Sequence, residues 1–233
     1  MRPAPYCTTV RRVTDLAPAV RELVLDPPNP RLNFLPGQWI SLHLPVGEKP
    51  PLVRAYTLAA APAACGELTL CLDRYPDGLG SVYVYGLQPG EPVQFDGPLG
   101  RFVLPDTIQD MLWIARYTGI VPFRAMLQDL RTRPPAGTLT LLYEAPTSDD
   151  LIYRAEIEET AAACPWFTAQ FHRNATLDTV PGVTTMTALS RIVGERQDLA
   201  PMVCGVGAFV RPMREFFTHR GYERRAVRCE AYD

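Results

Sequence analysis

The apolar pattern of this 233-residue chain changes near Pro105, and this change constrains the fold more than any other feature. Before Pro105 the apolar segments are short, and QWISLHL alternates apolar and polar residues. Turn signals rich in proline and glycine separate these segments, which is typical of a β-sandwich or β-barrel. We expect strands at Arg21–Asp26, Gln38–Leu44, Arg54–Ala59, Glu67–Asp73 and Pro92–Asp96, with one short helix at Leu79–Tyr85.

After Pro105, strands and helices alternate. The run MLWIA at Met111–Ala115 is continuously apolar, as in a strand that is buried on both faces. The elements expected after it are helix Val121–Leu130, strand Thr138–Tyr143, helix Asp150–Ala163, strand Phe167–His172, helix Thr185–Gly194, strand Pro201–Cys204, helix Ala208–Thr218 and strand Ala226–Glu230. Such alternation implies right-handed crossovers and a doubly wound parallel sheet. We therefore expect two domains, residues 1–105 and 106–233.

The composition argues against several classes of protein. The net charge is −2, so no strong attraction to nucleic acid is built in. We expect no membrane insertion, because no apolar run reaches the ~20 residues of a membrane-spanning helix. The N-terminal residues also lack the apolar stretch of a secretory signal. The six cysteines supply neither a C-x2-C metal clamp nor an iron–sulfur set. We expect no metal site, free thiols and a cytoplasmic location.

The segment Arg54-Ala55-Tyr56-Thr57 carries side chains suited to one elongated ligand. Arg54 can bind phosphate through charge-assisted hydrogen bonds, and Tyr56, two residues away on the same face of a strand, can lie against a flat ring. Thr57 can hydrogen-bond to the edge of that ring. The alternative is a surface strand with a salt-bridged arginine and a half-buried tyrosine.

The segment Gly78-Leu79-Gly80-Ser81 opens the expected short helix. Its two glycines allow close approach of the backbone to a ligand. The N-terminus of a helix attracts phosphate through its free N–H groups and its dipole. The segment is therefore a candidate phosphate site, and the alternative is that Ser81 is a plain helix cap.

Together with several later segments, these motifs resemble the ferredoxin–NADP reductase superfamily. The resemblance covers roughly residues 6–233, and it implies an antiparallel Greek-key β-barrel that binds flavin, followed by a doubly wound parallel-sheet domain that binds a nicotinamide nucleotide. The segments that carry it are Phe34–Ile40, Arg54–Thr57, Gly78–Tyr83, Asp96–Phe102, Thr118–Arg124, Asp150–Glu156, Cys204-Gly205 with Met213, and Glu230–Tyr232.

The resemblance implies that the first domain binds the flavin, and the presence of both domains favours FAD. Arg54 would contact a flavin phosphate, Tyr56 would pack on the isoalloxazine ring or the ribityl chain, and Thr57 would hydrogen-bond near N5. Ala55 belongs to the same strand motif. The diphosphate would lie at the helix start, which comprises Gly78, Leu79, Gly80 and Ser81.

The resemblance also implies a site for NADPH or NADH in the second domain. Thr118 and Gly119 would bind the pyrophosphate. Cys204 and Gly205 would lie beside the nicotinamide C4. Tyr232 would cover one face of the flavin ring, as terminal aromatic residues do in some relatives.

The chemistry that the resemblance implies is hydride transfer from a reduced nicotinamide C4 to flavin N5. The electrons would then pass to a ferredoxin-like protein, an oxygenase component or a small acceptor. No general acid–base pair is needed for the hydride step. Glu230 would assist proton transfer, and the alternative is a surface carboxylate at the end of a strand.

Three positions depart from the family pattern. Arg116 and Tyr117 replace two glycines before Thr118, and Val206 replaces a proline. Glycine allows positive φ and a close approach to phosphate. Arg116 can compensate for the lost glycines with direct charge, and the alternative is that Tyr117 fills the dinucleotide crevice. These changes support a second hypothesis, an electron-relay or docking subunit with weakened nicotinamide binding. A third hypothesis is a scaffold protein without flavin.

Arginine positions bear on nucleotide choice and on partners. Arg173 follows the third expected parallel strand, where relatives that prefer NADPH often place a Ser-Arg pair. It can contact a 2′-phosphate, and the alternative is an exposed surface arginine. The stretch Arg211–Arg228 contains six arginines. It can dock an acidic electron-transfer partner, and the alternative is a solvated helix face.

Overall fold

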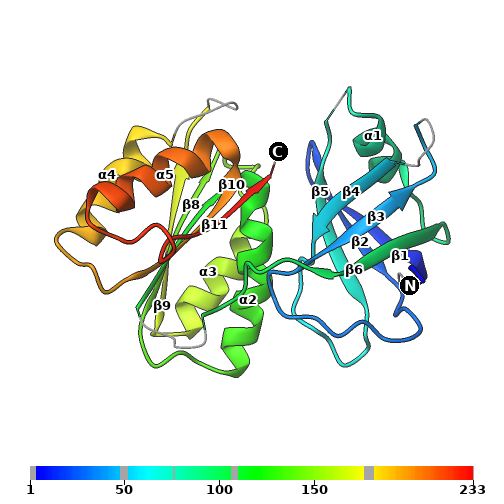
Figure 1. The fold of residues 1–233 in the computed structure, drawn as a ribbon, viewed down its shortest axis with the longest axis horizontal. Coiled ribbons are helices and arrows are strands. Elements are labelled where there is room, and N and C mark those ends of the chain that lie inside the picture. The colour runs from blue at the N-terminus through cyan, green and yellow to red at the C-terminus, as the bar shows by residue number, and fades with distance from the viewer. Residues whose placement is uncertain (1–3, 48–51, 76, 106–109, 176–180, 233) are drawn as a thin grey trace. The chain divides into compact units, whose positions relative to one another are not determined.

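A computed structural model describes residues 4–47, 52–75, 77–105, 110–175 and 181–232. The chain forms two compact units (Figure 1). The first unit comprises Met1–Val103 with Arg124–Asp129, and the second comprises Leu104–Phe123 with Leu130–Asp233. None of the helices in the described part of the chain is long and apolar enough to cross a membrane.

The first unit is built on a six-stranded antiparallel sheet with the order β4-β3-β6-β1-β2-β5. An isolated bridge joins Leu58, directly after β4, to Leu70 of β5, so the two edges of the sheet meet and form a barrel. The predicted antiparallel barrel is therefore confirmed. Its strands are β1 Tyr6–Ala17, β2 Val20–Leu25, β3 Trp39–Leu44, β4 Leu52–Thr57, β5 Leu68–Asp73 and β6 Pro92–Leu99.

The core of the barrel follows the alternation that the sequence predicts. In β3, Ile40, Leu42 and Leu44 are buried, whereas the residues between them are partly exposed. Side chains of β2, β5 and β6 complete the same cluster, with Phe95 fully buried. Helix α1, Leu79–Gly86, follows β5 and contacts β3, β4 and β5.

Strand β1 is absent from the sequence-based prediction. Only Val10 among its twelve residues is fully buried, and the adjacent Arg11 and Arg12 interrupt the alternation. A register irregularity between Val10 and Arg12 shifts the pattern further. The strand is stable because it pairs with both β2 and β6, and such pairing leaves little signal in the strand's own residues.

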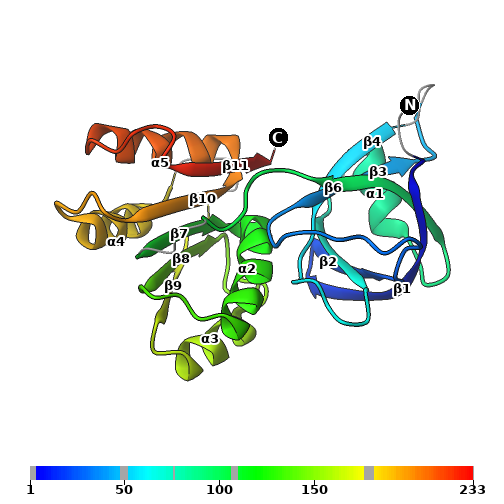
Figure 2. The same ribbon diagram turned by 60° about the horizontal axis from the view of Figure 1, so that its bottom comes forward.

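The second unit contains a five-stranded parallel sheet with the order β11-β10-β7-β8-β9. Helices lie on both faces of this sheet, α2 and α3 on one face and α4 and α5 on the other (Figure 2). The predicted doubly wound sheet is therefore confirmed. Its elements are β7 Met111–Arg116, α2 Val121–Thr132, β8 Leu139–Ala145, α3 Arg154–Ala163, β9 Phe167–Arg173, α4 Val183–Val193, β10 Ala200–Val206, α5 Gly207–His219 and β11 Arg228–Tyr232. Within α2, residues Arg124–Asp129 group with the first unit.

Strand β7 is buried on both faces, as the run MLWIA predicts. Leu112 and Ile114 belong to the cluster that packs against α4 and α5. Trp113 points to the opposite face and stacks on Phe123, with ring centroids 5.0 Å apart. This strand is therefore held centrally, and its carboxyl end has a fixed position in the unit.

Helix α3 begins at Arg154, four residues after the predicted start at Asp150. The Asp150 carboxylate accepts hydrogen bonds from the backbone N–H and the hydroxyl of Thr147. Tyr153, which precedes the helix, has a left-handed φ of 59°. A local turn therefore competes with the helix for residues 150–153.

Candidate functional site

Strand β4 carries the four residues that the sequence predicts for a flavin. Arg54 and Ala55 are exposed, Tyr56 is half-buried and Thr57 is buried. Tyr56 pairs with Ile40 of β3 and packs against the core of the barrel. Arg54 and Tyr56 lie on one face of the strand because they are two residues apart. The strand therefore presents a cation and an aromatic ring next to each other.

The start of helix α1 lies against this strand. A Cβ atom on Gly80 would be 2.8 Å from Leu52 Cδ2 and 3.3 Å from Arg54 Cγ, so the helix lies close against β4 at this residue. Gly78 is the N-cap, and no side chain of the described residues caps the helix. The first N–H groups of a helix carry partial positive charge. Arg54 and the start of α1 are therefore the candidate residues of the first unit for a phosphate group.

The Ser81 hydroxyl is bonded to the segment before the helix. Its Oγ accepts a hydrogen bond from the Tyr75 backbone N–H at 2.7 Å and donates one to the Asp73 carbonyl at 3.2 Å. Ser81 therefore does not cap α1 but holds the end of β5 against the start of the helix. Leu79, in the same turn, is exposed.

Tyr56 is a neutral phenol across the physiological range. Burial raises the pKa of Tyr56 to about 12; the Asp73 carboxylate adds to this increase and the Arg54 cation opposes it. A neutral phenol can pack against a flat ring and donate one hydrogen bond. Tyr56 can therefore orient a ligand without exchanging a proton with it.

In the second unit, the strand order reverses between β7 and β10. Open parallel sheets bind ligands at such a switch point, beyond the carboxyl ends of the strands. Strand β7 ends at Arg116 and continues into a single 3-10 turn, η1 Tyr117–Ile120. The predicted Thr118 and Gly119 lie in this turn, and both are buried.

Gly119 brings η1 into direct contact with β10. A Cβ atom at residue 119 would lie 2.3 Å from the Cys204 carbonyl oxygen and 2.9 Å from the Gly205 nitrogen. No larger residue fits there without a shift of the backbone. The structure therefore places Thr118, Gly119, Cys204 and Gly205 together at the switch point.

Tyr117 keeps the backbone conformation that a glycine would favour. Its φ is 51°, in the left-handed region that non-glycine residues seldom adopt. A bulky residue in this conformation is strained, and the surrounding structure has to hold it. Residue 117 therefore combines a bulky side chain with a left-handed backbone conformation.

Arg116 forms a buried ion pair that the sequence analysis missed. Its guanidinium donates to the carboxylate of Glu144, its register partner at the end of β8. Arg116 is 4% exposed and Glu144 is 0% exposed. One sequence feature could have indicated Glu144. It is a carboxylate that directly follows the apolar run LTLLY, and this run belongs to the strand after the one that ends at Arg116.

Strand β11 places two further predicted residues beside β10. Cys204 pairs with Glu230, and Val206 pairs with Tyr232. Burial, followed by the Glu230 charge, raises the pKa of the Cys204 thiol well above its ordinary value, whereas a hydrogen bond with Tyr232 acts in the opposite direction. Cys204 therefore remains a protonated thiol at neutral pH and does not act as a nucleophile.

Arg173 lies at the carboxyl end of β9, at the edge of the sheet and away from the switch point. It is exposed, and its register partner is Ala145 at the end of β8. The sheet therefore presents this cation at the same carboxyl edge as the other predicted residues of the second unit, but two strands away from β7.

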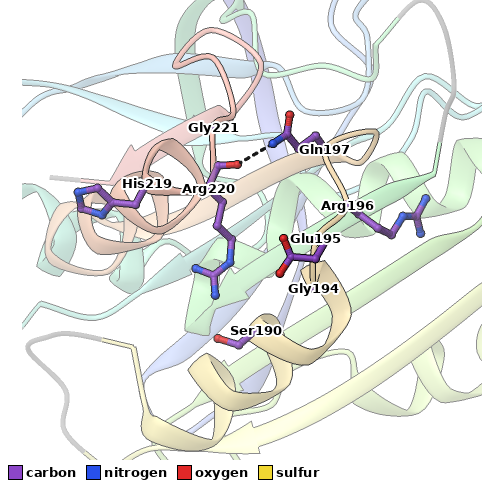
Figure 3. Close-up of a pocket in the computed structure, with 8 residues that line it drawn as sticks. All are labelled: Ser190, Gly194, Glu195, Arg196, Gln197, His219, Arg220 and Gly221. Carbon is purple, nitrogen blue, oxygen red and sulfur yellow. Dashed lines mark hydrogen bonds between the residues drawn. The ribbon is translucent and has the colours of Figure 1, made fainter.

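A polar hollow of about 500 Å³ lies elsewhere in the second unit (Figure 3). It is formed by the carboxyl ends of α4 and α5 and by the loop before β10, and Gln197 Nε2 donates to the Arg220 carbonyl across it. The residues lining it are Ser190, Gly194, Glu195, Arg196, Gln197, His219, Arg220 and Gly221. None of the predicted site residues is among them, because the hollow lies at the amino edge of the sheet.

Two family models match the chain. Residues 8–104 match the oxidoreductase FAD-binding domain, and residues 114–215 match the oxidoreductase NAD-binding domain. The chain is 30% identical to ferredoxin–NADP reductase B of Sorangium cellulosum, over 98% of both proteins. It is 27% identical to the ferredoxin reductase component of the 3-ketosteroid-9-alpha-monooxygenase of Mycobacterium tuberculosis, over 88% of the chain and 59% of that protein.

Among solved structures, the Amycolatopsis cytochrome P450 reductase superposes with a TM-score of 0.82 at 25% identity, over 97% of the chain and 69% of that protein. The chain spans nearly all of the Sorangium relative but only about three-fifths of the mycobacterial one. From the two matched domains and the full-length relative it follows that the chain belongs to the ferredoxin–NADP reductase superfamily, as an NAD(P)H-dependent flavoprotein oxidoreductase with FAD and NADPH or NADH as its cofactors.

Proposed function

We propose that the chain passes electrons from NADPH or NADH through FAD to a ferredoxin-like protein or an oxygenase component. The relatives that carry such names support this acceptor class. The structural observation that carries the proposal is that each unit has a glycine of the predicted site in close contact with a neighbouring strand. Gly80 lies against Arg54 in the first unit, and Gly119 lies against Cys204 in the second. We assign FAD binding to residues 1–105 and nucleotide binding to residues 106–233.

In the first unit, we assign diphosphate binding to Arg54 and the start of α1 at Gly78–Ser81. A cation and free helix N–H groups are complementary to two phosphate charges. Tyr56, as a neutral phenol, orients the flavin ring, and Thr57 at the end of the same strand hydrogen-bonds to the ring edge. FAD, when bound, accepts a hydride from the reduced nicotinamide and releases the electrons to an acceptor.

In the second unit, we assign the nucleotide pyrophosphate to the turn that contains Thr118 and Gly119. Cys204 and Gly205 border the nicotinamide. Glu230, opposite Cys204 in register, is our candidate for assisting proton transfer at this edge, and Tyr232 provides the last aromatic ring beside it.

Arg173 is our candidate for contact with a 2′-phosphate, because it is an exposed cation at the carboxyl edge of the sheet. If it binds that phosphate, Arg173→Ala raises the KM for NADPH and leaves the KM for NADH unchanged. The alternative, a plain surface arginine, predicts equal KM values in the variant and the wild-type protein.

A cytoplasmic location remains a prediction from the free cysteines.

The acceptor class is tested with purified plant-type ferredoxin and with ferricyanide as a small acceptor. We expect NAD(P)H-dependent reduction of both, followed spectroscopically under anaerobic conditions. Ferricyanide reduction without any ferredoxin reduction would restrict the function to small acceptors or to a partner of another kind. No reduction of either acceptor would contradict the proposed function.

A second candidate is an electron-relay subunit that has lost nicotinamide binding. The buried ion pair favours this candidate. Glu144 neutralises the Arg116 charge, which would otherwise attract the nucleotide phosphates in place of the missing glycines. In that case dithionite reduces the flavin, whereas neither nicotinamide nucleotide does. Replacing Arg116 and Tyr117 together by glycine then increases NAD(P)H oxidation strongly, and a loss of oxidation shows that the native pair assists binding.

A further inference from the structure

The Glu144 carboxylate is completely buried, and four donors among the described residues surround it. Oε1 accepts hydrogen bonds from Arg116 and from Asn174 Nδ2, the latter at 3.1 Å. Oε2 accepts from the Gly182 backbone N–H at 2.8 Å and from the Thr185 hydroxyl at 2.5 Å. A buried carboxylate is tolerated only when such donors compensate for its desolvation. Glu144 is therefore fixed in position.

These contacts join four elements at the carboxyl edge of the sheet. Arg116 ends β7, Glu144 is the second-to-last residue of β8, and Asn174 directly follows β9. Gly182 is the N-cap of α4, and Thr185 lies in its first turn. A carboxylate at a helix N-terminus is also favoured by the helix dipole. One side chain thus connects three strand ends and the start of a helix.

His172 extends the network by one residue. Its Nδ1 lies 3.0 Å from the Thr185 hydroxyl. Because Thr185 gives its only proton to Glu144, His172 donates from Nδ1. Burial lowers the pKa of His172, with the Glu144 charge opposing this shift, so the imidazole is neutral at pH 7. The network therefore contains one cation, Arg116, and one anion, Glu144.

The turn after Arg116 is held from both sides. On the β8 side, Arg116 is anchored by Glu144. On the β10 side, Gly119 is pressed against Cys204. Between these anchors Tyr117 has its strained left-handed φ. Strained backbone persists only where neighbouring structure fixes it, so the shape of residues 117–120 depends on both anchors.

We propose that Glu144 is a positioning residue for the nicotinamide nucleotide: through Arg116 and the start of α4 it fixes the turn Tyr117–Ile120 on which the pyrophosphate docks. The inference rests on the proposed function, since it takes the nucleotide to bind at this turn. In this arrangement Arg116 affects nucleotide binding by fixing the shape of the turn, and its guanidinium pairs with Glu144. A positioning residue of this kind is needed because small displacements of a binding loop reduce affinity.

The mildest test removes one hydroxyl, which bonds to both Glu144 and His172, and leaves both members of the ion pair in place. Thr185→Val keeps the shape of the side chain and deletes the hydroxyl. We expect the Kd for NADPH or NADH to rise about tenfold, as when one charge-assisted hydrogen bond is lost, with the FAD content unchanged. The matched control is Thr187→Val on the exposed side of α4, whose hydroxyl bonds only to the Val183 carbonyl among the described residues.

A second test separates positioning from stability. Glu144→Gln leaves Arg116 buried without its counter-charge and lowers the melting temperature. The double variant with Arg116→Met and Glu144→Gln removes both charges, so we expect most of the melting temperature to recover. We expect the nucleotide Kd to be raised in Glu144→Gln and to stay raised in the double variant, because the turn has lost its anchor in both. Recovery of the Kd together with the melting temperature would show that the pair is merely structural, and would overturn the inference.

Amide hydrogen exchange gives a readout that does not need the nucleotide. Thr185→Val is expected to accelerate exchange at residues 117–120, and Thr187→Val is not. Unchanged exchange and unchanged Kd in Thr185→Val would contradict the inference even if the wild-type protein oxidises NAD(P)H. A wild-type protein that binds neither nucleotide, but shows accelerated exchange in the variant, would instead contradict the nicotinamide part of the proposed function, and with it the docking step.

Discussion

At the scale of single residues, Gly80 and Gly119 show where the site depends on the absence of a side chain. Gly119 faces the Cys204 carbonyl, which belongs to the backbone and cannot rotate away. We predict that Gly119→Ala destabilises the protein by about 1–3 kcal/mol, the usual cost of overpacking. The control is Gly86→Ala in α1, where nothing lies within 4 Å of an added Cβ. Urea denaturation of both variants measures the difference, and equal midpoints would refute the contact.

Arg54 is the residue on which flavin retention depends most directly. Arg54→Ala removes the exposed cation beside the start of α1, and we predict FAD affinity to fall by about 10- to 100-fold, as for loss of a hydrogen bond to a charged group. Arg11→Ala serves as the control, since this exposed arginine of β1 pairs with Glu67. FAD content after gel filtration reports the outcome. Equal retention in both variants would remove Arg54 from the site.

The six cysteines provide a chemical test of which side chains are buried. Cys7 and Cys65 are exposed, whereas Cys204 is buried and its thiol pKa is raised by that burial and by Glu230. Only a thiolate reacts readily with iodoacetamide. We predict that Cys7 and Cys65 are alkylated in the native protein and that Cys204 is not. Mass spectrometry of peptides identifies the labelled residues, and rapid labelling of Cys204 would contradict its placement between β7 and β11.

At the scale of elements, Asp110 links the starts of β7 and β8. Its carboxylate accepts from the Thr138 N–H at 2.8 Å and pairs with Arg196 at 2.7 Å. The Thr138 N–H is the largest cause that lowers the pKa of Asp110 to about 2, and the Arg196 hydrogen bond follows it. The ordinary pKa is near 3.9, so the folded state binds this proton more weakly than the unfolded chain does.

The stabilisation by Asp110 is therefore complete above about pH 4 and is lost as the pH falls toward about 2. We predict that Asp110→Asn lowers the urea midpoint at pH 7 and that its midpoint approaches that of the wild-type protein as the pH decreases. Asp149→Asn, at an exposed position between β8 and α3, is the control. A difference in midpoint that is independent of pH would contradict the role of the ionised carboxylate.

At the scale of the whole molecule, regular elements were predictable wherever burial imposes a period. The alternation of β3 and the continuous apolar run of β7 follow directly from the faces that they bury. Strand β1 was not predictable. It pairs with β2 and β6 through backbone hydrogen bonds, whereas its side chains are largely exposed and follow no apolar pattern. Family motifs identified the fold in segments where the apolar residues follow no clear period.

The candidate site was predictable only in part, for a similar reason. Motifs marked the strand ends, and the structure brings Thr118, Gly119, Cys204 and Glu230 together at one switch point. Contacts between elements were invisible in the sequence. The bond of Ser81 to Asp73 and the pairing of Arg116 with Glu144 depend on which strands become neighbours. No local pattern specifies such contacts.

The central claim is that the protein binds FAD and reduces it with a nicotinamide nucleotide. The most direct measurement is an anaerobic titration of the purified, FAD-loaded protein with NADH and with NADPH, followed at the yellow absorption band of the flavin. The account predicts that at least one nucleotide bleaches the band. A colourless protein that takes up no FAD, or a yellow protein that neither nucleotide bleaches, would contradict it.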